Sequence, residues 1–161
     1  MAAPGAPFSQ RALGNCLALF RVFIGIKFLT LGYSKLGMLH SHMMATMLTQ
    51  WGTDPKNPFH SYQQFLLHTA VPNSDIFTIL VITGEMTVGF ALILGLATRF
   101  AALVGFVMNA NYLLATASIG SAWLVNQTFM AIELLFFFTA AGRILGFDAI
   151  LARRFPHFPA W

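Results

Sequence analysis

The stretch IFTILVITGEMTVGFALILGLA at residues 76–97 is long and apolar enough to cross a lipid bilayer, yet Glu85 lies near its middle. A helix of about 20 predominantly apolar residues spans the hydrocarbon core of a membrane. Further stretches of this kind lie at residues 12–35, 100–119 and 123–143. The pattern predicts an all-α integral membrane protein, a four-helix bundle whose backbone hydrogen bonds are satisfied inside each helix.

The composition supports a membrane protein and excludes several other classes. Of the 161 residues, 57% are hydrophobic and 9% are charged, whereas about a quarter of the residues in an ordinary soluble domain are charged. The net charge is +4, but the basic residues are scattered, so no nucleic-acid surface is predicted. The single cysteine, Cys16, excludes a disulfide within the chain and a redox mechanism that needs paired cysteines.

We expect a single membrane domain, residues 1–161, in which only one connection between spanning helices is long. This connection, residues 36–75, joins the first two helices and contains the turn signal TDPKNP at residues 53–58. A short interfacial helix is expected on each side of that turn. A basic, aromatic tail follows the last helix at residues 144–161.

Basic residues indicate the orientation of the bundle, because short loops that carry positive charge remain in the cytoplasm. If the helices alternate in direction, five arginines lie at the ends that share one side of the membrane. They are Arg11, Arg99, Arg143, Arg153 and Arg154. Both termini are therefore predicted to be cytoplasmic, and residues 36–75 extracytoplasmic.

Ionisable and amide side chains inside the predicted spans are the candidate functional residues. A charge at the bilayer centre costs about 2.5–3.5 kcal/mol on insertion scales, so such residues usually pair within the protein or line a polar pathway. The candidates for an intramembrane polar system, close to a bound quinone, are Arg21, Lys27, Glu85, Asn109, Asn111, Asn126 and Glu133.

The depth of each charged residue, from a rise of about 1.5 Å per residue, indicates which groups pair. Arg21 lies at the depth of Glu133, and Lys27 lies nearer Glu85. We therefore expect an Arg21–Glu133 pair and a Lys27–Glu85 pair. These pairs either only hold the bundle together or form a functional polar pocket.

No metal site is predicted. Four histidines, His40, His42, His60 and His68, lie in the connection between the first two spans. A haem held by two histidines would need them on facing membrane helices, and the last three predicted spans have none. Nothing in the spacing of His40, His42 and His60 fixes the geometry of a surface copper or zinc site.

Three segments carry a resemblance to a known family. RVFIGIKFLTLGYSKL at residues 21–36 and GEMTVGFALILGLATRFAAL at residues 84–103 resemble the DoxX-like family of small four-helix integral membrane proteins. AAGRILGFDAILARR at residues 140–154 is similar to that family's closing segment. The positions that match are Arg21, Gly25, Gly32, Lys35, Gly84, Glu85, Gly89, Gly95, Arg99, Glu133, Gly142, Arg143 and Asp148.

The resemblance implies a multi-pass protein of a prokaryotic cytoplasmic membrane, related to the membrane subunit of thiosulfate:quinone oxidoreductase. It implies lipid, other protein subunits and quinone as partners, and no covalently bound cofactor. The polar residues named above would then lie near the quinone and carry its protons. A non-catalytic accessory or scaffold subunit remains the alternative, because the sequence has no nucleophile–base pair, metal motif or nucleotide-binding loop. Whether the chain itself is an enzyme stays open.

Overall fold

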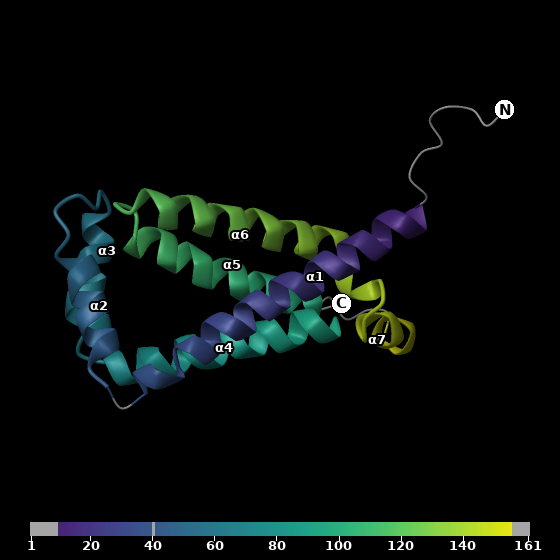
Figure 1. Ribbon diagram of the computed structural model, residues 1–161, viewed down its shortest axis with the longest axis horizontal. Helices are drawn as coiled ribbons and strands as arrows, with labels where there is room; N and C mark the ends of the chain where they lie inside the picture. The colour runs from purple at the N-terminus through teal and green to yellow at the C-terminus, as the bar shows by residue number, and fades with distance from the viewer. Residues whose placement is uncertain (1–9, 40, 156–161) are drawn as a thin grey trace.

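The computed structural model describes residues 10–39 and 41–155, and every regular element within these ranges is a helix. The predicted all-α fold is therefore confirmed. Four long helices lie lengthwise beside one another (Figure 1). They are α1 (Gln10–Ser34), α4 (Ser74–Leu94), α5 (Thr98–Ala115) and α6 (Gly120–Thr139). Residues 1–9, 40 and 156–161 lie outside the described part, so His40 and the end of the predicted tail are not placed.

Glycines bring α1 and α4 into backbone contact. A Cβ atom added to Gly25 would lie 2.8 Å from the carbonyl oxygen of Gly89, and one added to Gly89 would lie 2.8 Å from the carbonyl oxygen of Gly25. About two turns further along α1, a Cβ atom on Gly32 would lie 3.2 Å from the Cβ of Glu85. Small residues permit such close packing of membrane helices. These contacts set the register of α1 against α4.

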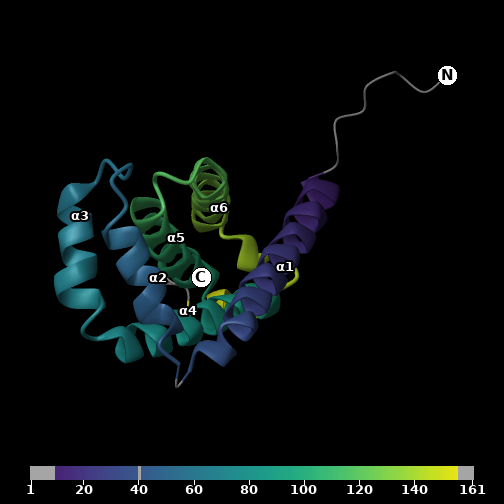
Figure 2. The ribbon, with the colours of Figure 1, turned by 60° about the vertical axis from the view of Figure 1, so that its left-hand side comes forward.

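The connection between α1 and α4 folds over one end of the long helices (Figures 1 and 2). It contains η1 (Leu36–Met38), α2 (Met43–Gly52), α3 (His60–Phe65) and a π-helical turn, η2 (Leu66–Ala70). Met44, Leu48 and Leu66 form a small apolar core with Ala115 at the end of α5. We call this region the outer layer, residues 36–73 without residue 40.

Polar contacts fasten the outer layer to the turn between α5 and α6. Asn57 is fully buried, and its Nδ2 donates hydrogen bonds of 3.0 Å to the carbonyl oxygens of Leu114 and Ala115. The Ser118 hydroxyl donates to Asp54. That bond, together with one from the backbone N–H of Lys56, holds the pKa of Asp54 below its ordinary value. The last carbonyls of α5, which have no partner within the helix, are thus satisfied by the outer layer.

Within the described residues, three helical segments are long and apolar enough to cross a membrane: Ala12–Met38, Ser74–Leu94 and Gly120–Thr139. The chain is therefore a multi-pass membrane protein. Its outer faces carry large apolar side chains that suit contact with lipid. The fourth expected span, residues 100–119, corresponds to α5, which ends at Ala115 and does not meet the same criterion.

Beyond α6 the chain leaves helical geometry and turns back toward α1. Ala140 and Leu145 have positive φ angles of 47° and 50°, which are unfavourable for residues with a side chain. Between them lies η3 (Ala141–Arg143), and α7 (Asp148–Arg154) follows. These segments lie at the end of the four long helices opposite the outer layer (Figure 1).

We predict that Gly25→Val lowers the melting temperature in detergent, because the new side chain meets the backbone of Gly89 at less than contact distance. Overpacking of this kind typically costs about 1–3 kcal/mol. Gly37→Val is the matched control, since a Cβ there has no neighbour within 4 Å. Equal melting temperatures for the two variants would contradict the close packing of α1 and α4.

Candidate functional site

A buried ion pair joins α1 to α4. The Lys35 Nζ, just after the end of α1, lies 2.6 Å and 2.7 Å from the two carboxylate oxygens of Glu85 in α4. Glu85 is buried, and the Lys35 side chain is 15% exposed. The Tyr112 hydroxyl of α5 donates a 3.0 Å hydrogen bond to Glu85 Oε1, and Lys35 Nζ lies 5.5 Å from the centre of the Tyr112 ring. One carboxylate therefore connects three of the long helices.

The expected Lys27–Glu85 pair is wrong. Lys27 is exposed, and its Nζ lies 5.3 Å from the centre of the Phe23 ring. The register set by the glycines puts Glu85 beside Gly32 instead, so Lys35, one turn further, is the lysine within reach. Lys35 shares the α4-facing stripe of α1, whereas Lys27 lies about 120° around the helix.

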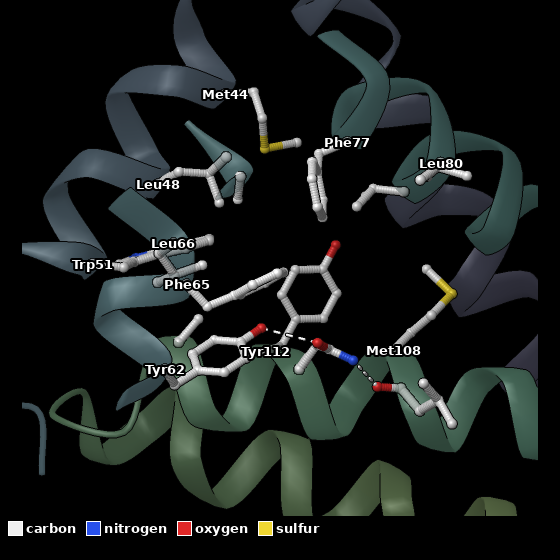
Figure 3. Close-up of a pocket in the computed structure, with 15 residues that line it drawn as sticks. Met44, Leu48, Trp51, Tyr62, Phe65, Leu66, Phe77, Leu80, Met108 and Tyr112 are labelled. Carbon is white, nitrogen blue, oxygen red and sulfur yellow. Dashed lines mark hydrogen bonds between the residues drawn. The ribbon is translucent and has the colours of Figure 1, made fainter. Parts of the chain in front are cut away.

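A cavity of about 330 Å³ lies between the outer layer and helices α4 and α5 (Figure 3). Its walls are mostly apolar and aromatic, and it falls in the size range of small-molecule sites. Side chains that define it include Met44, Trp51, Phe65, Phe77, Leu80 and Met108. Among the side chains in its wall, the oxygen-bearing ones are Tyr62, Asn111 and Tyr112. The cavity is therefore an apolar chamber with a few placed polar groups.

The polar groups of the cavity belong to two hydrogen-bond chains. The Tyr62 hydroxyl donates a 2.9 Å hydrogen bond to Asn111 Oδ1, and the Asn111 side-chain amide donates a 2.7 Å hydrogen bond to the carbonyl oxygen of Val107. Burial raises the pKa of Tyr62 to about 12. On the other side, Tyr112 leads from the cavity to the Glu85–Lys35 pair. This second chain can pass a proton between the cavity wall and a charged pair.

A second buried carboxyl, Glu133 of α6, lies apart from this cavity. Its Oε1 accepts a 2.8 Å hydrogen bond from the Asn109 amide, while Oε2 has no hydrogen-bond partner among the described residues. Gly105 leaves room for the carboxyl, because a Cβ atom there would lie 2.7 Å from Oε1. The expected pair with Arg21 is wrong: Glu133 interacts with an amide of α5.

Arg21 lies instead at the α7 end, where it satisfies backbone carbonyls. Its guanidinium donates to the carbonyl oxygens of Ala141 at 2.8 Å, Leu145 at 3.2 Å and Ile144 at 3.4 Å. Depth alone could not reveal this, because the acceptors come from the irregular backbone after α6. Nearby, the Asp148 carboxylate accepts hydrogen bonds from the backbone N–H groups of Ala97 and Thr98, at 2.6 Å and 2.9 Å. We call Arg21 and Asp148 the polar latch.

Two glycines of the family pattern are explained by the polar latch. A Cβ on Gly95, which also has a φ of +63°, would overlap the Arg21 guanidinium. A Cβ on Gly142 would overlap the Asp148 carboxylate and the Thr98 hydroxyl. These two matches therefore have a structural role at the α7 end.

The seven candidate residues are thus divided among several places. Glu85 and Asn111 belong to the cavity and its hydrogen-bond chains, and Asn109 binds Glu133. Asn126 is buried and donates to the Thr116 hydroxyl at 3.5 Å, which links α6 to the end of α5. No cluster of three or more His, Cys, Asp or Glu side chains that could hold a metal occurs in the described ranges.

Three residues of the site were missed from the sequence: Lys35, Tyr62 and Tyr112. Lys35 did carry a signal, because it continues the stripe of Arg21, Gly25 and Gly32 on one face of its helix. The two tyrosines resemble ordinary interfacial aromatics, and only the fold shows that they meet at one cavity.

A family model described as "TQO small subunit DoxD" matches residues 55–160. The match covers about two thirds of the chain, from the middle of the outer layer to the C-terminal segment. It confirms the family resemblance predicted from the sequence. Neither the curated proteins nor the solved structures contain a match.

We predict that Lys35→Met lowers the melting temperature in detergent far more than Lys27→Met. Removal of Lys35 leaves the Glu85 charge buried without its partner, and breaking a buried pair typically costs about 3–5 kcal/mol. Lys27 is exposed, so its replacement serves as the matched control. If Lys27→Met were the more destabilising of the two, the assignment of the ion pair would be wrong.

Proposed function

The chain belongs to the DoxD family, the small subunits of thiosulfate:quinone oxidoreductase, and from that premise we propose that it supplies the quinone site of a quinone-linked membrane oxidoreductase. The quinone ring occupies the cavity between the outer layer, α4 and α5. The observation that carries this proposal is the position of Tyr112, which lines the cavity and hydrogen-bonds to the buried Glu85–Lys35 pair.

The cavity suits a flat, weakly polar ring. Trp51, Phe65 and Phe77 offer faces and edges for aromatic contact, and a volume of about 330 Å³ accommodates one substituted ring. In Figure 3 the Tyr112 hydroxyl points toward Phe77, while the Tyr62 hydroxyl points toward Asn111. The two polar chains thus reach the cavity at different places. A quinone has two carbonyl oxygens on opposite sides of its ring, and this arrangement supports their separate recognition.

Proton delivery is the chemical role that the residues support. Reduction of a quinone to a quinol adds two electrons and two protons, and the electrons come from a partner subunit. Tyr112 can give one proton to a quinone oxygen and regain one from the Lys35 ammonium by way of the Glu85 carboxylate, which lies 2.6 Å from Lys35 Nζ. Lys35, whose side chain is 15% exposed, then takes up a proton from outside the site, and a second passage along the same path completes the quinol. General acid catalysis by a placed side chain typically contributes a factor of about 10²–10⁴.

The proposal includes four membrane spans in a prokaryotic cytoplasmic membrane, with α5 as the additional span. α5 lies alongside α6 and returns the chain between two spanning helices (Figure 1). The α7 end carries Arg99, Arg143, Arg153 and Arg154, so it faces the cytoplasm, and the outer layer with its cavity faces outward. Quinone, lipid and the electron-donating subunit are then the partners of the chain.

We predict that Tyr112→Phe lowers quinone reduction by the co-purified complex about 100-fold, because the ring remains and only the proton path is lost. Tyr33→Phe is the matched control, since Tyr33 is 72% exposed and no hydrogen bond of its hydroxyl is part of the site. The measurement is turnover with a soluble quinone, together with assembly of the complex.

A complex with Tyr112→Phe that assembles and turns over at the native rate would contradict the proton path. Binding is tested separately on the purified chain, by quenching of Trp51 fluorescence with a benzoquinone, and Trp51→Phe identifies the responding residue. Absence of saturable quenching would favour the alternative, a non-catalytic accessory or scaffold subunit.

A further inference from the structure

A second apolar cavity, about 540 Å³, lies between α4 and α5, next to the first. Leu80 and Met108 line both cavities. From this junction the second cavity runs along the helices toward the turn at Leu96 and Ala97. We call it the α4–α5 groove. Met108 lies eleven positions after Ala97, the residue before α5, which corresponds to a length of about 16 Å at 1.5 Å per residue.

Small side chains keep the α4–α5 groove open. On α4 it is lined by Thr83, Gly84, Thr87 and Ala91, and beyond α4 by Ala97, just before α5, and Ala101 of α5. Its lining is almost entirely apolar, unlike that of the first cavity, which contains two tyrosines and an asparagine. A Cβ atom on Gly84 would lie 2.9 Å from the Met108 sulfur, so the methionine packs directly against the glycine.

We propose that the α4–α5 groove holds the isoprenoid chain of the quinone whose ring lies in the first cavity. The inference rests on the proposed function. Its basis is that the two cavities are neighbours that share Leu80 and Met108 in their walls, and that the first is partly polar whereas the groove is apolar. A quinone likewise has a polar ring followed by a long apolar chain, so its ring matches the first cavity and its chain matches the groove. Leu80 is 60% exposed, so the junction opens toward lipid, from which such a molecule enters.

The ring and the chain of a quinone need different surroundings, and the structure provides these in two neighbouring cavities. The first cavity has the polar groups of Tyr62, Asn111 and Tyr112 in its wall to orient a ring, whereas the groove offers mainly van der Waals packing. Because lipid tails are as apolar as the groove lining, the groove selects by shape and length and not by hydrophobicity. Met108 is flexible enough to adapt as the chain passes the junction.

Thr87→Phe tests the assignment, since Thr87 lines the groove, is exposed and lies two turns from Leu80. Thr128→Phe is the matched control, because Thr128 is also exposed on a long helix but lies outside both cavities. Dissociation constants are measured by Trp51 quenching in one detergent for a tailless benzoquinone and for the same benzoquinone with a four-unit isoprenoid chain. Partition into micelles then affects all variants equally.

We expect the native chain and Thr128→Phe to prefer the long-chain quinone at least tenfold over the tailless one. Thr87→Phe should reduce that preference at least fivefold and leave the affinity for the tailless quinone unchanged. If Thr87→Phe keeps the native preference, the groove does not hold the chain. If it also sheds a co-purified phospholipid, the groove is an acyl-chain site. If no variant binds either quinone, both this inference and the proposed function fail, whereas binding without any chain preference overturns this inference alone.

Discussion

The arrangement of the helices depends on how buried charges are stabilised, and the Lys35–Glu85 ion pair is the clearest example. A carboxylate and an ammonium inside a membrane protein are tolerated only when they satisfy each other or nearby polar groups. The pair lies 2.6 Å apart at the point where α1 meets α4. It requires α1 and α4 to be in one register, and the backbone contact of Gly25 with Gly89 supplies that register. Tyr112 then attaches α5 to the same carboxylate.

At the opposite end of the long helices, a buried charge is stabilised by backbone carbonyl oxygens and not by a carboxylate. Arg21 is only 1% exposed, and its guanidinium is stabilised there by hydrogen bonds to backbone carbonyl oxygens. Those carbonyls are available because the chain leaves helical geometry after α6, with left-handed residues at Ala140 and Leu145. Non-helical backbone near the membrane is tolerated when its polar groups find partners in the protein. The polar latch therefore explains both the buried arginine and the irregular turn.

The sequence predicted the long helices well because hydrophobic length is a local property, readable from one segment at a time. It failed on the partners of Arg21 and Lys27, because pairing depends on register and on which face of a helix meets its neighbour. An estimate of depth along a straight helix contains neither the register nor the direction in which a side chain faces. The cavity could not be predicted at all, since it forms only where the outer layer folds back on α4 and α5. Residues such as Asn57, which fasten that layer to Leu114 and Ala115, show no pattern in the sequence.

Photo-crosslinking tests the central claim, that the cavity beside Tyr112 and the Glu85–Lys35 pair receives the quinone ring, most directly. An azido-benzoquinone is activated by light in native membranes, and the labelled residues are mapped by mass spectrometry of peptides. Our account predicts saturable labelling at Trp51, Phe77 or Met108, which line the cavity, with loss of label when excess unmodified quinone competes. Labelling confined to the lipid-facing surfaces of α1 and α6, undiminished by competitor, would contradict it.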